Sequence, residues 1–172
     1  HNHNFNIGGG SKSTTYSADF TYRKEEGVIL ETYNEEMKMS FDVSHWMLND
    51  MLKVNLNMVK TLHKNGPIDA ATAGIYRQAI MRNPTESIWN EDGTFNENFA
   101  VNYYYNPVGI IREQDGKYTS ENTRMTGNVT FEPFKGWQTN LMVGRRTTND
   151  HNRGYYNSEY YSQKSENHTG YA

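Results

Sequence analysis

The sequence predicts an all-β chain whose antiparallel strands form part of a transmembrane β-barrel. The chain of 172 residues is polar yet rich in aromatics: 35% of residues are hydrophobic, 13% are aromatic, and the mean hydropathy is -0.92. Disordered chains are poor in aromatic residues, so a folded structure is expected. Strands with one apolar face and one solvent-exposed polar face account for both the low hydropathy and the high aromatic content.

Strict alternation of apolar and polar residues in successive segments supports this prediction. Between 16 and 23, for example, every aromatic residue falls on one face of the expected strand and every charged residue on the other. About seven strands of a larger barrel are expected, the last without clean alternation. They cover 3–9, 15–24, 35–44, 51–62, 119–131, 137–146 and 154–162.

The connections between these strands are alternately short and long. Short turns are expected over 8–13, around 48–50 and over 133–136. Longer connections cover 25–33, 63–118 and 146–153. Bacterial outer-membrane barrels have this asymmetry, with short periplasmic turns and longer extracellular loops. The whole of 1–172 is therefore interpreted as part of one barrel domain, with 63–118 as a long extracellular loop.

The long loop has its own local signals. The segment 68–81 predicts a short helix, with Asp69 as N-cap and Asn83-Pro84 at its end. The apolar face of this helix is expected to pack on the barrel lumen, a plug or a partner protein. A turn is expected over 90–93, and an aromatic stretch, Tyr103 to Tyr105, leads to Pro107.

Aromatic residues also gather near the short turns. Phe131, Phe134 and Trp137 flank one of them, and Trp46 precedes another. An interfacial girdle on the periplasmic side explains this placement. The general preference of Trp and Tyr for β-structure explains it as well.

Several classes of chemistry are disfavoured. The net charge is -3, with 17 basic and 20 acidic residues interspersed, which indicates no nucleic-acid surface. Cysteine is absent, and the six histidines form no metal-binding motif, so neither a metal nor another cofactor is expected. No nucleophile-elbow, Walker or dinucleotide motif is present, and no enzymatic activity is predicted.

Four stretches of the sequence, in their order along the chain, resemble the SusC/RagA-type TonB-dependent outer-membrane transporters. They are His3 to Gly10, Glu26-Gly27-Val28, Asn83-Pro84-Thr85 with Asn90-Glu91-Asp92-Gly93, and Tyr105-Asn106-Pro107-Val108-Gly109. The resemblance covers nearly the whole chain.

Membership of this family implies a barrel of about twenty-two strands around a plug domain, in the Gram-negative outer membrane. It also implies a SusD-like lipoprotein lid and the import of glycans or peptides powered through TonB. No plug domain is present here, and about seven strands cannot close a barrel in lipid, so the chain is expected to be a fragment. The competing hypothesis is a secreted all-β binding module or adhesin. A porin or autotransporter would share the barrel and lack the lid.

Aromatic side chains on the long loop are the candidate contacts for the substrate or the lid, because sugar rings and peptide side chains pack on aromatic faces. These candidates are Trp89, Tyr103, Tyr104 and Tyr105. The alternative is that they pack against the loop itself. On the strands, the charged residues of the polar faces would line the lumen and meet the plug, or would simply be solvated in a soluble protein. They are Asp19, Arg23, Lys38, Asp42, Lys53 and Arg124.

Overall fold

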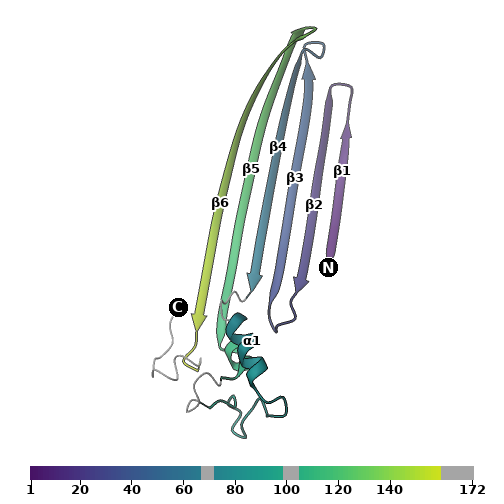
Figure 1. The fold of residues 1–172 in the computed structure, drawn as a ribbon. Coiled ribbons are helices and arrows are strands. Elements are labelled where there is room, and N and C mark those ends of the chain that lie inside the picture. The colour runs from purple at the N-terminus through teal and green to yellow at the C-terminus, as the bar shows by residue number, and fades with distance from the viewer. Residues whose placement is uncertain (67–71, 99–104, 160–172) are drawn as a thin grey trace. The chain divides into compact units, whose positions relative to one another are not determined.

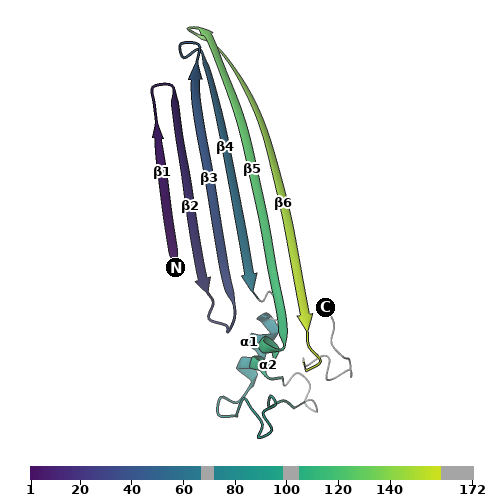
Figure 2. The same ribbon diagram turned by 180° about the vertical axis from the view of Figure 1, so that it is seen from behind.

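The structure, a computed structural model, describes residues 1–66, 72–98 and 105–159. Six strands form one open antiparallel sheet in which each strand pairs with its neighbours in sequence order (Figures 1 and 2). The elements in chain order are β1 (Asn2–Gly10), β2 (Thr14–Glu26), β3 (Tyr33–Met47), β4 (Leu52–Gly66), α1 (Thr72–Met81), α2 (Pro107–Arg112), β5 (Gln114–Phe134) and β6 (Trp137–Tyr156). The predicted all-β class is confirmed.

The strands are longer than their alternating segments predict. β5 has 21 residues and β6 has 20. The predictions of a polar loop over 146–153 and of a separate strand over 154–162 were wrong for the described residues. Residues 146–156 continue β6, 157–159 lie beyond its end, and the rest of that predicted strand lies outside the described residues. This part of β6 is polar on both faces and therefore shows no alternation. The backbone can still pair with β5, because ladder hydrogen bonds do not depend on side-chain polarity.

The alternation of short and long connections is confirmed. Tight turns at 11–13, 48–51 and 135–136 join β1 to β2, β3 to β4 and β5 to β6 at one end of the sheet (Figure 1). Leu48, Asn49 and Asp50 all have positive φ, and Gly136 has φ of 94°. Asn, Asp and Gly adopt this left-handed region most readily, which explains why these residues occur in the turns between the strands.

The glycine run differs from its predicted place in the first turn. Gly8, Gly9 and Gly10 belong to β1 and pair with Ser17, Tyr16 and Thr15 of β2. A Cβ at Gly9 would lie only 2.7 Å from the Tyr16 hydroxyl oxygen, so the Tyr16 ring occupies the space that a side chain would need. Glycine in this strand therefore permits the close approach of an aromatic ring.

The chain divides into a sheet unit (1–25, 35–64 and 119–150) and a loop unit (26–34, 65–118 and 151–172). The predicted helix over 68–81 is present as α1, while its proposed N-cap Asp69 lies outside the described residues. In the loop unit, Ile75 of α1 packs with Ile110 and Ile111 of α2. Among the described residues, no helix is both long and apolar enough to cross a membrane.

Candidate functional site

One face of the sheet unit is apolar and exposed. Alternate residues of each strand share a face, so the apolar rows of neighbouring strands combine into one band. We call this face the apolar band; its large exposed members include Phe5, Ile7, Tyr16, Met39, Phe41, Leu56, Met58, Met125, Phe131, Trp137, Leu141 and Val143. Among the described residues of the sheet unit, no apolar side chain is buried. Such a large apolar surface indicates contact with lipid or protein.

The apolar band ends at charged residues on the side away from the short turns. The same alternating rows continue into Lys24, Glu35, Lys60, Glu121 and Arg145, which we call the charged border. The Lys60 ammonium lies 3.4 Å from a Glu121 carboxylate oxygen, and Lys64 lies 3.2 Å from Glu35. The rows therefore change from apolar to charged part of the way along the strands.

Aromatic rings lie at the opposite end of the apolar band. Trp137 stacks on Phe134 with ring centroids 5.8 Å apart and meets Phe131 edge to face at 6.5 Å. These three rings lie where the sequence predicts an interfacial girdle. Trp46 differs, since it lies on the polar face, where the Lys53 ammonium sits 4.8 Å from its ring centroid.

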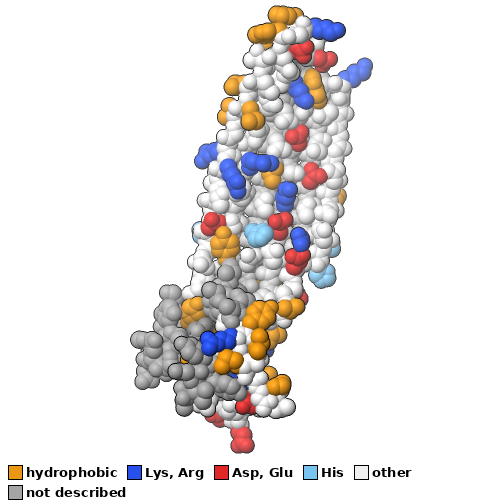
Figure 3. All heavy atoms as spheres, in the orientation of Figure 1, with side chains coloured by type: hydrophobic (Ala, Val, Ile, Leu, Met, Phe, Trp, Pro, Cys, Tyr) orange, Lys and Arg blue, Asp and Glu red, His pale blue; other side chains and the backbone are white. Residues whose placement is uncertain are grey.

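The other face of the sheet unit is polar and organised by hydrogen bonds. Lys, Arg, Asp and Glu side chains are interspersed over the face seen in Figure 3. Asn6 donates to one carboxylate oxygen of Asp19, and the Ser40 hydroxyl donates to the other at 3.1 Å. Asn55 donates to both carboxylate oxygens of Asp42, each at 3.2 Å. These hydrogen bonds hold both carboxylates in a fixed orientation, in which they can contact another polar surface.

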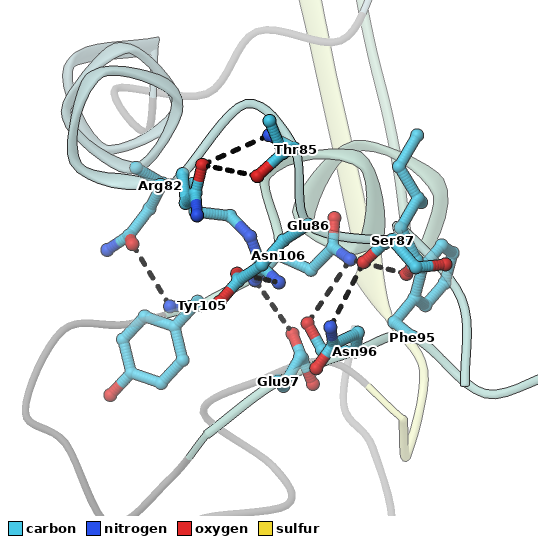
Figure 4. Close-up of polar contacts among 12 residues, drawn as sticks. Arg82, Thr85, Glu86, Ser87, Phe95, Asn96, Glu97, Tyr105 and Asn106 are labelled. Atoms are coloured by element: carbon cyan, nitrogen blue, oxygen red, sulfur yellow. Dashed lines mark hydrogen bonds and ion pairs between the residues drawn. The ribbon is translucent and has the colours of Figure 1, made fainter.

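The loop unit is built around Asn106, which is 1% exposed (Figure 4). Its amide nitrogen donates to the carbonyls of Ile88 at 2.8 Å and Asn96 at 3.3 Å, and its side-chain oxygen accepts the Val108 N–H at 3.0 Å. The last bond makes Asn106 the N-cap of α2, with Pro107 in the first turn. An Asn-Pro pair is a signal for a helix start, and it identifies this helix, which was not predicted.

Trp89 lies on a small hairpin within the loop unit. It bridges and stacks on Phe95, with ring centroids 4.3 Å apart, and remains 44% exposed. The Phe95 ring in turn rests on Gly109 of α2, where a Cβ would lie 3.1 Å from the ring. The exposed indole is thus supported from beneath by packed groups.

The hairpin turn is closed by Asp92 and Gly93. The Asp92 carboxylate accepts hydrogen bonds from the Thr94 hydroxyl at 2.6 Å and the Thr94 N–H at 3.0 Å. These bonds lower the pKa of the Asp92 carboxyl below its ordinary value, the hydroxyl contributing most. Gly93 has φ of 81°, which suits glycine. The turn expected over 90–93 is therefore present.

The other candidate contacts are placed differently from Trp89. Tyr105 is partly buried against Ile75, Ile110 and Ile111, and its N–H donates to the Gln78 side chain at 3.0 Å. This position agrees with the alternative that an aromatic residue packs against the loop itself. Tyr103 and Tyr104 lie outside the described residues. Of the four candidates, Trp89 is the one with a described, exposed ring on a supported surface.

No group of three or more Asp, Glu and His side chains that could hold a metal ion is found within 1–66, 72–98 and 105–159. The scan of family models and the search of curated proteins found no match to the sequence. Physical arguments from the two faces of the sheet and from the loop unit therefore carry the functional interpretation.

Proposed function

We propose that this chain forms part of the barrel wall of a TonB-dependent outer-membrane importer of glycans or peptides, working with a SusD-like surface lipoprotein. The observation that carries this proposal is an exposed apolar band with an aromatic cluster beside the β5–β6 turn at one end and charged residues at the other. The family and the partners are proposed from the sequence resemblance alone.

The height of the apolar band supports contact with a bilayer. From Trp137 to Arg145 a strand rises about 27 Å at ~3.4 Å per residue. For a strand tilted by ~40°, this rise corresponds to about 20 Å along the membrane normal. Outer-membrane barrels present an apolar band of ~25 Å between aromatic girdles. The part of β6 beyond Arg145 would then rise above the lipid on the side away from the short turns.

The alternative of a secreted binding module fits the strands less well. Soluble sheets usually have strands of ~3–10 residues, whereas β3 and β4 have 15 each and β5 has 21. Soluble sandwiches also commonly use Greek-key connections, while these six strands follow one another in simple up-and-down order. Long strands in this order support the barrel-wall proposal.

The polar face suits the lumen of such a barrel. Its carboxylates, Asp19 and Asp42, are oriented by Asn and Ser donors, and Lys53 covers Trp46. Polar groups that are already oriented bind a polar surface with less loss of conformational freedom. In this proposal they meet the plug domain or the passing substrate.

Detergent dependence tests the membrane proposal. We expect the full-length protein to sediment with outer membranes, to resist extraction by salt, and to need detergent to remain monodisperse. The apolar band has no cover among the described residues, so water alone should not keep the protein dispersed. A monodisperse protein in plain buffer would contradict the proposal. Co-purification of a surface lipoprotein in mild detergent would distinguish this importer from a porin or an autotransporter.

Trp89 is the residue through which substrate contact is best tested. We expect Trp89→Ala to raise the KM for uptake by about fivefold or more, because an exposed aromatic face is lost. Trp89→Phe should retain most of the activity, since a ring that can stack on Phe95 remains. Uptake of labelled oligosaccharides and oligopeptides by whole cells measures this effect.

The neighbouring substitution Ile88→Ala is a matched control, because Ile88 is equally exposed, at 45%, and has no aromatic ring. Unchanged uptake of both probe classes by the Trp89→Ala variant would remove Trp89 from the proposed substrate site.

A further inference from the structure

The apolar band contains a hollow that the barrel-wall proposal does not require. The hollow has a volume of about 430 Å3 and is bordered by Phe41, Leu56, Met58, Met125, Val143 and Arg145. Gly127 lies in it, and a Cβ there would be 3.5 Å from the Leu56 side chain and 4.0 Å from the Val143 carbonyl oxygen. The missing side chain of Gly127 leaves part of this space open.

The chemistry of the hollow is that of a lipid tail beside a charged headgroup. Its lining is almost entirely apolar, and its volume falls within the range of about 300–1,000 Å3 typical of small-molecule sites. A flexible acyl chain fits a shallow apolar depression that opens sideways. A soluble ligand would gain few polar contacts there.

Arg145 provides the charge at the edge of this hollow. It belongs to the charged border, about 20 Å above Trp137 along the membrane normal by the estimate given above. Within the described residues, Lys60 pairs with Glu121 and Glu35 pairs with Lys64, whereas Arg145 has no counter-charge. Guanidinium groups bind phosphate through paired hydrogen bonds.

We propose that the hollow and Arg145 bind one molecule of lipid A, with an acyl chain over Gly127 and a phosphate on Arg145. This inference rests on the proposed function. In the proposed barrel wall, where the short turns are periplasmic, the charged border lies at the far end of the apolar band, at the level of the headgroups of the outer leaflet. Lipid A is the acylated, phosphate-bearing lipid of that leaflet, and it combines the two chemical groups that the site accommodates.

Native mass spectrometry of the full-length protein in mild detergent tests the proposal, with purified lipid A and phosphatidylethanolamine offered together. We expect bound lipid A, with about tenfold lower affinity for Arg145→Gln because a charge-assisted contact is lost. Gly127→Leu should weaken binding several-fold by filling the hollow. Arg146→Gln is the matched control: Arg146 lies against Asn122 on the polar face, so lipid A binding should not change.

Two results would overturn the lipid A site. One is equal retention of lipid A by the wild type and by both variants, provided that all of them extract from the membrane as folded, monodisperse protein. The other is retention of phosphatidylethanolamine in preference to lipid A. Failure of the protein to enter the membrane at all would instead contradict the proposed function, and the two failures are thus distinguishable.

Discussion

In the proposed barrel wall, Leu141→Arg is expected to destabilise the protein by about 2–4 kcal/mol. Leu141 is 62% exposed and lies midway between Trp137 and Arg145 on β6, which places it near the middle of the apolar band. An arginine near the bilayer midplane costs this much in transmembrane barrels, because its charge loses hydration. Denaturant unfolding in lipid vesicles measures the change, and the amount of protein in outer membranes should fall as well.

Asn140→Arg is the matched control for Leu141→Arg. Asn140 is the preceding residue of the same strand, so its side chain points to the polar face. The introduced charge should remain hydrated in the water-filled lumen of the proposed barrel and should therefore be tolerated. On a soluble protein both positions would be ordinary surface sites, and each substitution would change stability by at most ~0.5 kcal/mol. Equal, small effects of the two variants would therefore place the apolar band outside the lipid.

Asn106→Ala is expected to lower the free energy of local unfolding of the loop unit by about 2–4 kcal/mol. The substitution removes the side-chain donor from the carbonyls of Ile88 and Asn96, of which Ile88 keeps the Asn96 N–H at 2.9 Å, and it leaves the Val108 N–H without its cap. Hydrogen exchange measures this loss, since amides protected by the network should exchange roughly 30- to 1,000-fold faster. Residues of β2 and β3 in the sheet unit should keep their protection.

Two further variants separate the roles of Asn106. Asn106→Asp keeps an oxygen that can cap α2, but it places a buried carboxylate oxygen against the carbonyl oxygens of Ile88 and Asn96, so it should cost at least as much as Asn106→Ala. Asn83→Ala removes an exposed side chain whose oxygen accepts from the N–H and hydroxyl of Thr85, and should cost at most ~1 kcal/mol. If Asn106→Ala exchanges no faster than Asn83→Ala, Asn106 does not organise the loop.

The sheet was predictable where its two faces differ in polarity. From Thr14 to Arg23, and again in β3 and β4, alternation identified each strand and the residues that share its faces. The short turns were recognisable from Asn49, Asp50 and Gly136, which tolerate positive φ. Alternation vanishes where both faces are wet, and for this reason the far half of β6 was mistaken for a loop.

The loop unit was less predictable, because its contacts join residues that are distant in sequence. The sequence around Asn106 predicts only a turn residue before a proline. In the structure, its side-chain amide also joins the segments around Ile88 and Asn96. Tyr105 and Trp89 look alike as aromatic loop residues, but Tyr105 is partly buried and Trp89 is half exposed. Burial is a property of the packed chain and has no signal in the local sequence.

Side-chain alternation and turn residues act locally, and they were enough to predict antiparallel strands with one apolar and one polar face. The folded sheet was needed to show that the charged residues of β2 to β6 gather at the end of the apolar band away from the short turns, and that Gly127 leaves a hollow beside Arg145. Strand register aligns residues that are far apart in the chain, and that alignment arises only when the sheet is formed.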